Sequence, residues 1–190
     1  MRAKTPILVS GIVSTFIAAA ASADFSSASW TLSENSVSPS LNQFFVGQVL
    51  TVGGSASVGG SGSLSSSTMT LVGGNASTAG ATWYSAVASA AGTISVDWAY
   101  TNAPGSDSGG WDGAGWVLNG SFTVLAINSG SPASGTLTFS VNAGDTFGFG
   151  AVTADGFFGA GTATFTNFVP APGAVGLLAM AGLAGSRRRR

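Results

Sequence analysis

The side chains that could carry out chemistry in this 190-residue chain are restricted to a few types. The sequence contains no His and no Cys, which removes Ser-His-Asp catalysis, thiol nucleophiles, and the imidazole and thiolate ligands of zinc or copper. The six basic residues are Arg2, Lys4 and Arg187 to Arg190, so none lies between residues 5 and 186. Carboxylates, hydroxyls, amides and aromatic rings remain for binding or catalysis.

The lack of internal basic residues excludes several classes of function. Nucleic-acid binding needs Lys or Arg to displace counterions from phosphates, and nucleotide enzymes need a cationic clamp on the transferred phosphate. All seven acidic residues lie between Asp24 and Asp155, so the chain between its two ends carries only negative charge. We therefore expect no nucleic-acid partner.

Paired carboxylates are the catalytic arrangement that this composition still permits, as in glycoside hydrolysis. A fold could bring Asp112 and Asp155 together for that purpose. However, nothing in the sequence places either acid in an apolar pocket that would raise its pKa, and no cation or imidazole could polarise a substrate. We therefore predict that the protein is not an enzyme.

Trp111 is the aromatic residue that we single out as a candidate for ligand binding. It lies among the small and acidic residues of the segment 106–112, which is typical of a loop, where an exposed aromatic ring suggests a carbohydrate site. The other large aromatic residues fit a hydrophobic core better, because they lie in or beside apolar segments. These residues are Trp30, Trp83, Tyr84, Trp98 and Trp116.

The elements that must position these residues are β-strands, because apolar positions repeat with a period of two. Alternate residues are apolar over 94–100 and 137–141, and shorter alternating pairs occur at 122 and 124 and at 147 and 149. Eight or nine short, half-buried strands without a helical stretch predict an all-β fold. We expect a single antiparallel β-sandwich over residues 24–168.

Turn signals separate the predicted strands. Asn119-Gly120 suits a type I′ hairpin, the segment 142–145 suits a four-residue turn, and Asp155-Gly156 closes a third turn. The Gly- and Ser-rich segment 53–67 is either a long loop or a poorly packed edge strand. Ala and Ser in place of Lys and Glu leave the sheet edges weakly protected against pairing with other chains.

Residues 1–23 have the pattern of a secretory signal peptide. Basic residues at positions 2 and 4 precede an apolar run, and Ala21 and Ala23 supply the small residues of an A-x-A cleavage site. An uncleaved membrane anchor is the alternative. We expect cleavage before Asp24 and export of the mature chain.

The tail, residues 169–190, combines a Pro-x-Pro element, an apolar run over 173–186 and a terminal basic cluster. A helix of that length spans about 21 Å, less than the roughly 30 Å of a hydrocarbon core, so the run is marginal as a permanent span. The basic cluster stays on the cytoplasmic side, which predicts transient insertion into the inner membrane through a short hydrophobic helix. The residues of the two motifs are Pro170, Ala171, Pro172, Gly173, Arg187, Arg188, Arg189 and Arg190.

This tail resembles the PEP-CTERM sorting signal of exosortase-bearing Gram-negative bacteria. It has the same three parts in the same order, with Ala171 where the common form has Glu. The resemblance implies an exosortase-type processing enzyme as partner, removal of the Arg cluster, and release to the cell surface, outer membrane or extracellular matrix. An ordinary tail anchor with a basic flank is the alternative.

The second half of the body resembles a CUB-like jelly-roll domain. Residues 111–120 match its aromatic-Asp, strand and turn-Gly segment, and residues 153–168 match its later Asp-loop-Gly-strand segment. The disulfides usual in that family are absent, since the chain has no Cys.

The CUB-like resemblance implies a calcium ion held by Asp112 and Asp155, with Asp107 as the nearest substitute for an earlier Glu of the family. Calcium also suits the composition, because it prefers hard oxygen ligands and an acidic body without cations attracts a divalent ion. The alternative is that these three aspartates and Asp145 are solvated turn residues that bond to their own backbone.

Together these features predict a non-catalytic, exported protein of the cell surface or of a biofilm's exopolysaccharide matrix, with exopolysaccharide as a candidate partner. This hypothesis requires no cofactor. The competing hypothesis is a calcium-dependent, lectin-like carbohydrate-binding module that uses Trp111 and the nearby aspartates.

Overall fold

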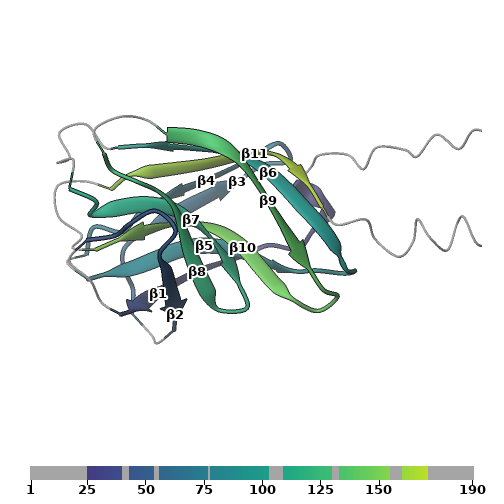
Figure 1. Ribbon diagram of the computed structural model, residues 1–190, viewed down its shortest axis with the longest axis horizontal. Coiled ribbons are helices and arrows are strands. Elements are labelled where there is room, and N and C mark those ends of the chain that lie inside the picture. The colour runs from purple at the N-terminus through teal and green to yellow at the C-terminus, as the bar shows by residue number, and fades with distance from the viewer. Residues whose placement is uncertain are drawn as a thin grey trace, which may run out of the picture.

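The described part of the chain forms eleven antiparallel strands in two sheets, as the computed structural model shows (Figure 1). The structure describes residues 25–39, 43–53, 56–76, 78–102, 109–129, 133–154 and 160–170. The predicted all-β, two-sheet architecture is confirmed. Within these ranges the only helix is the short 3-10 turn η1 (Phe25–Ser27), so no described helix could cross a membrane.

The strands follow one another without an intervening α-helix in the described ranges. They are β1 (Thr31–Ser38), β2 (Val49–Val52), β3 (Ser61–Leu64), β4 (Thr68–Val72), β5 (Gly80–Val87), β6 (Gly92–Thr101), β7 (Asp112–Leu118), β8 (Ser121–Ile127), β9 (Ala133–Val141), β10 (Thr146–Thr153) and β11 (Thr162–Val169).

One sheet closes on itself in the order β1-β2-β8-β7-β10-β5. Closure occurs at β1, because residues 31–36 pair with β5 and residues 37–38 pair with β2. The second sheet is open, with five strands in the order β3-β4-β11-β6-β9. The sandwich therefore consists of an open sheet packed against one side of a closed sheet.

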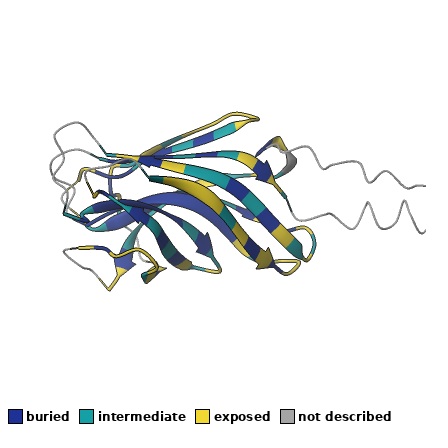
Figure 2. Ribbon diagram, turned by 45° about the horizontal axis from the view of Figure 1, so that its top comes forward, coloured by how far each residue is buried: buried dark blue, intermediate teal, exposed yellow. Residues whose placement is uncertain are grey.

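Two hydrophobic cores result from this arrangement. Figure 2 shows the buried residues along the strands of both sheets. The larger core lies between the sheets and contains Phe149 of β10 and Phe165 of β11, whose rings stack with centroids 5.0 Å apart. The smaller core lies inside the closed sheet, around Trp83 and Phe122. The rings at positions 147 and 149 point to the larger core, as predicted, but the strand is not half-buried, because its other face lines the smaller core.

The inside of the closed sheet has room for few side chains, and two paired glycines leave the space that the Phe122 ring occupies. Gly115 of β7 lies opposite Gly150 of β10, and the buried Phe122 ring lies over both. A Cβ at Gly150 would lie 2.7 Å from the Thr82 carbonyl oxygen, closer than real Cβ contacts allow, and 3.0 Å from the Phe122 ring, which is tighter than most such contacts. Glycine at both positions therefore permits strands β7 and β10 to line a core this narrow.

Two of the three predicted turns are described, and both are confirmed. Asn119 and Gly120 join β7 to β8 with φ values of 49° and 80°, as a type I′ hairpin requires. The turn from Asn142 to Asp145 closes with a hydrogen bond of 3.1 Å from the Asp145 amide to the Asn142 carbonyl, and it carries the chain from the open sheet to the closed one. The third turn, at Asp155-Gly156, lies outside the described residues.

The structure differs from the sequence prediction in strand number and in one boundary. Eleven strands replace the eight or nine expected, since β2 and β3 are only four residues long and leave little alternation to detect. Part of the Gly- and Ser-rich segment 53–67 forms β3, at an edge of the open sheet. Strand β11 ends at Val169, one residue inside the predicted tail.

We expect Gly115→Ala and Gly150→Ala each to lower the free energy of unfolding by about 3 kcal/mol, the upper range for overpacking a core. At Gly115 the added methyl would overlap the Phe122 ring and the Thr123 carbonyl oxygen. Urea unfolding of the purified protein measures the effect. Gly53→Ala is the control, because its Cβ would meet no atom within 4 Å. A normal stability for both core variants would contradict this account of the closed sheet.

Candidate functional site

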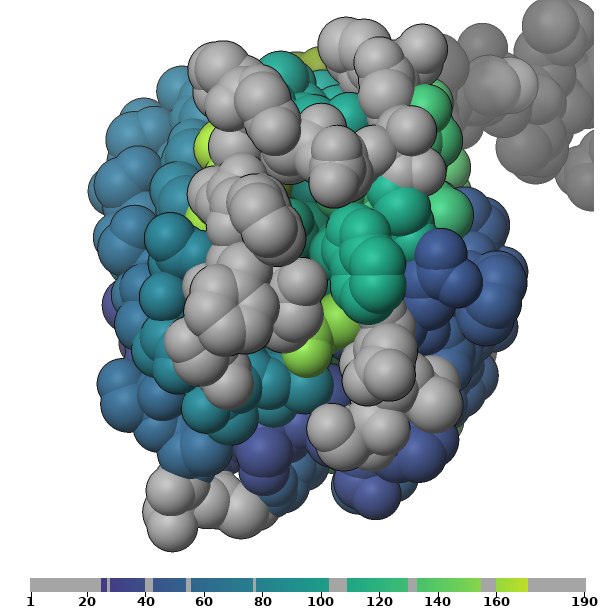
Figure 3. Space-filling view, turned by 90° about the vertical axis from the view of Figure 1, so that its left-hand side faces the viewer, coloured from purple at the N-terminus to yellow at the C-terminus, as the bar shows by residue number. Residues whose placement is uncertain are grey.

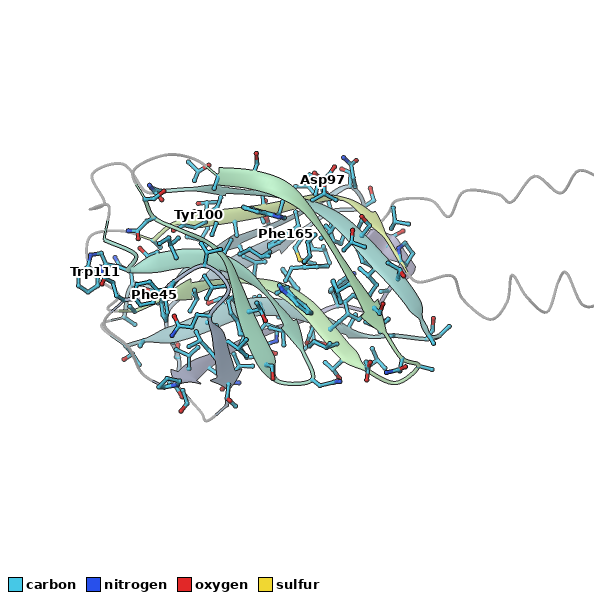
Figure 4. All side chains as sticks on the ribbon, viewed as in Figure 1. Phe45, Asp97, Tyr100, Trp111 and Phe165 are labelled. Carbon is cyan, nitrogen blue, oxygen red and sulfur yellow. The ribbon has the colours of Figure 1, made fainter. Side chains whose placement is uncertain are left out.

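The end of the sandwich opposite η1, which we call the loop end, carries the residues that the sequence singled out. We define the loop end by the segments 43–48 and 109–112 together with Asn102, Asn128 and Ala154. Figure 4 shows Trp111 and Phe45 near each other at this end. Figure 3 views it directly, with the green segment that begins at residue 109 reaching the surface.

Trp111 is half-buried and lies directly before β7. Its side chain packs against the smaller core, and its carbonyl accepts a hydrogen bond of 2.6 Å from the Ala154 amide. The indole lies against Gly109, where a Cβ would overlap the indole nitrogen. The ring is therefore held in a fixed position with part of its surface exposed, as a stacking platform requires.

The segment before β2 is bonded to the segment before β7. The Phe44 amide donates to the Gly110 carbonyl at 2.8 Å, and the Gln43 side-chain amide donates to the Gly109 carbonyl. Phe44 is fully buried, whereas the next residue, Phe45, is 63% exposed. These bonds place the exposed Phe45 on the segment adjoining that of Trp111.

A tight turn presents Phe45 and Val46 to solvent. The Gln48 amide donates to the Phe45 carbonyl at 3.0 Å, and Gly47 has a φ of 82° that favours glycine. The Gly47 amide also donates to the Val124 carbonyl at 2.8 Å, which ties the turn to β8. Val46 is 64% exposed, so two large apolar side chains project from a fixed backbone.

Phe45 is a residue of the loop end that the sequence analysis did not identify. The signal for it is the adjacent pair Phe44-Phe45 before Val46-Gly47. In extended chain, neighbouring side chains point in opposite directions, so one of two adjacent aromatic residues must face away from the core. The pair therefore predicts one exposed ring, although not which of the two.

Asp112 is the first residue of β7 and is only 3% exposed. Its amide donates to the Asn128 side-chain oxygen at 3.3 Å, its carbonyl accepts from the Asn128 amide at 2.9 Å, and Thr153 lies opposite it on β10. Asn128 and Thr153 are also buried. The alternative that Asp112 is a solvated turn residue is therefore wrong, because strand pairing encloses it.

Two further buried oxygens at the same end lack a hydrogen-bond partner among the described residues. They are the hydroxyl of Tyr100, which is fully buried and packs against Gly161, and the side-chain oxygen of Asn102. Burial, and then the negative charge of Asp112, raises the pKa of Tyr100 far above its usual value. A carboxylate and two unpaired oxygens thus collect beneath the loop end.

These donors have the chemistry that calcium prefers, since all are hard oxygens and one carries charge. The described residues contain no group of three acidic side chains that could hold a metal. Asp107 and Asp155, the other predicted ligands, lie outside the described residues. Of the three predicted ligands, Asp112 is therefore the one that the structure describes.

Two other aspartates have structural roles at the surface. Asp145 accepts from the Asn142 amide at 2.7 Å and from the Asn119 side chain at 3.0 Å, and these bonds lower its pKa. Asp145 is thus the turn residue that the sequence analysis expected. The Thr136 hydroxyl at 2.6 Å and the Asn167 side chain at 2.8 Å lower the pKa of Asp97 in the same way.

The aromatic residues assigned to the core are confirmed there. Trp83 is buried in the smaller core, and the other four pack against the larger one while keeping part of their surface exposed. These four are Trp30, Tyr84, Trp98 and Trp116.

The processing motifs fall almost entirely outside the described residues. This is so for the predicted cleavage site at Ala21, Ala23 and Asp24, and for the tail beyond Pro170. Pro170 follows β11 and lines a cavity of about 310 Å³ between the sheets, at the end opposite the loop end.

No protein-family model and no curated protein matches the sequence. Among solved structures, the family 35 carbohydrate binding module from Clostridium thermocellum aligns at 13% identity over 57% of this chain and 88% of its own, with a TM-score of 0.32. The CBM35 from Cellvibrio japonicus Abf62 aligns at 13% identity over 54% and 78%, with a TM-score of 0.30. The enzymatically active domain of tailspike protein 4 of Bacteriophage CBA120 aligns at 12% identity over 74% and 19%, with a TM-score of 0.35. These values assign the chain to no family.

We expect the Tyr100 hydroxyl to make the protein less stable at alkaline pH. The folded state keeps the hydroxyl protonated where the unfolded chain ionises it, so the free energy of unfolding should fall by about 1.4 kcal/mol per pH unit above about pH 10. Urea unfolding across that range measures the slope. Tyr100→Phe should remove it, whereas Tyr84→Phe, which leaves Tyr100 in place, should keep it. An unchanged slope in Tyr100→Phe would show that this hydroxyl ionises in the folded state.

Proposed function

We propose that this protein is an exported, non-catalytic component of the cell surface or of the exopolysaccharide matrix, delivered there by its PEP-CTERM-like tail. The observation that carries the proposal is that the two ends of the sandwich differ. The described chain enters and leaves at one end, and the exposed aromatic surface lies at the other (Figures 1 and 4).

Packing holds the first and last described residues together at the end opposite the loop end. Phe25, the first described residue, stacks on Phe168 of β11 with ring centroids 5.1 Å apart. Ala28 and Pro170 line the same cavity. A chain attached through its tail at this end would direct Trp111 and Phe45 away from the point of attachment.

The state of the two surface carboxylates, Asp97 and Asp145, fits a non-catalytic role. Hydrogen bonds lower the pKa values of Asp97 and Asp145, so both side chains are ionised at neutral pH and already bonded to neutral donors. Neither has the raised pKa that a general acid needs. The described residues also include no basic side chain that could polarise a substrate.

The delivery part of the proposal predicts two cuts in the chain. We expect surface-extracted protein to begin at Asp24 and to end between Pro170 and Gly173, without its Arg cluster. Intact-mass measurement on protein from the native host tests both ends. Deletion of residues 187–190 is the matched variant, because it should leave the cut at Asp24 unchanged while blocking release at the tail. A main species that retains Arg187 to Arg190 would overturn exosortase processing.

A second candidate function is calcium-dependent carbohydrate binding at the loop end. It is favoured by the partly exposed Trp111 beside the 63% exposed Phe45, because apolar rings on a fixed backbone can stack on sugar faces with little loss of entropy. The jelly-roll, CUB-like interpretation of the sandwich belongs to this candidate. A negatively charged body without cations would select a neutral polysaccharide over an acidic one.

For this candidate we expect Trp111→Ala and Phe45→Ala each to weaken binding to a neutral polysaccharide by at least about tenfold, the effect of losing one stacking ring. Affinity electrophoresis or calorimetry measures the change. Val87→Ala is the control, since Val87 is also 63% exposed but lines the cavity near Pro170, away from the loop end. Equal affinity in the Trp111 variant and the wild type would exclude the loop end as the sugar site.

The calcium part of this candidate has its own measurement. An ion that binds only the folded state at a hundredfold excess over Kd stabilises it by about 2.7 kcal/mol, which should raise Tm by several degrees relative to chelator. Asp112→Asn should lose the shift, whereas Asp97→Asn, on the outer face of the open sheet, should keep it. An identical wild-type Tm with and without calcium would leave Asp112 as a structural residue only.

A further inference from the structure

Among the described strands, free sheet edges occur in the open sheet alone. The closed sheet has no edge, because each of its strands has a hydrogen-bonded neighbour on both sides. In the open sheet, the strand order leaves one edge at β3 and the other at β9, each bonded to a single neighbour among the described strands. These two strands therefore present unpaired backbone N–H and C=O groups.

The β9 edge has none of the features with which proteins protect an edge strand. It runs for nine residues and pairs with β6 at nine successive positions without a bulge. Its sequence, ASGTLTFSV, contains no charged residue and no proline. Long, uncharged and regular edges are the ones that pair with another strand.

The β3 edge is different, because it is protected by its length. It has four residues, SGSL, and follows two consecutive glycines. A strand this short offers few hydrogen bonds to a partner. The two edges of one sheet thus provide an internal comparison, with one edge open to pairing and the other not.

We propose that β9 pairs with β9 of a second copy of this chain, about a twofold axis at Leu137, to join two open sheets into one. Leu137 is the central residue of the strand, so an axis there overlaps all nine residues. In this antiparallel register Leu137 faces its own copy and Thr136 faces the other copy's Thr138.

The side chains of β9 suit self-pairing on both faces. Its outer face carries only hydroxyl residues, which face one another across the axis, and on its inner face Leu137 faces Leu137 while the buried Phe139 faces the other copy's Gly135. Cross-strand hydroxyl pairs and apolar pairs are favourable, whereas like charges directly opposite each other are not. Asp97, which lies opposite Thr136 on β6, is bonded to Thr136 and Asn167. The outer-face residues are Ser134, Thr136, Thr138 and Ser140.

We expect the exported wild-type protein to associate into dimers with a Kd on the order of 10 µM, because one paired edge buries less surface than a standard interface. Sedimentation velocity over a concentration series measures this. The double variant Thr136→Lys/Thr138→Lys should be monomeric, with at least a tenfold larger Kd, because the register sets the introduced charges against each other.

A charge-swapped variant tests the register itself. In Thr136→Lys/Thr138→Glu each introduced charge faces its opposite, so this variant should dimerise at least as strongly as the wild type. The control Ser61→Lys/Ser63→Lys alters the β3 edge and should leave the dimer intact. Circular dichroism and thermal unfolding confirm that each variant is folded. A monomeric wild type, loss of the dimer in the β3 variant, or equal behaviour of the two β9 variants would each overturn the proposal.

Discussion

The narrow interior of the closed sheet is the constraint on which the rest of the molecule depends. Six strands enclose little space, and Phe122 fills it because Gly115 and Gly150 have no side chains beneath its ring. With these glycines the two strands that lie beneath the open sheet can turn Trp116 and Phe149 toward the larger core. One ring over two glycines thus lets the same two strands line both the smaller and the larger core.

A second property is the lack of Lys, Arg and His between residues 5 and 186, which means that the acidic side chains must be stabilised by neutral hydrogen-bond donors. Asp97 and Asp145 are held by amides, a hydroxyl and backbone N–H groups instead of by ion pairs. Asp112 is buried, and the bonds of its backbone amide and carbonyl to Asn128 fix its position. Such bonds to neutral donors do not depend on opposite charges in solution, so ionic strength should affect the described body chiefly through its overall negative charge. Burial of apolar side chains and backbone hydrogen bonds between strands therefore stabilise the fold.

The sequence predicts local features of this structure better than long-range ones. Alternation over 94–100 and 137–141 predicts β6 and β9, and Asn119-Gly120 predicts its hairpin, because those signals reside in neighbouring residues. Closure of the first sheet depends on β1 pairing with both β2 and β5, which no local pattern encodes. For the same reason the neighbours of Trp111 in the sequence suffice to predict a loop residue there. The burial of Asp112 cannot be predicted in this way, because it depends on strands that are distant along the chain.

The central position of β10 has a consequence for how the molecule comes apart. This strand is buried on both faces and paired on both sides, and it contributes Phe149 to one core and Val152 to the other. Displacement of β10 would therefore expose both cores at once, which couples them in unfolding. The amides of β10 should exchange with deuterium only through global opening, whereas those of β3 should exchange through local fraying.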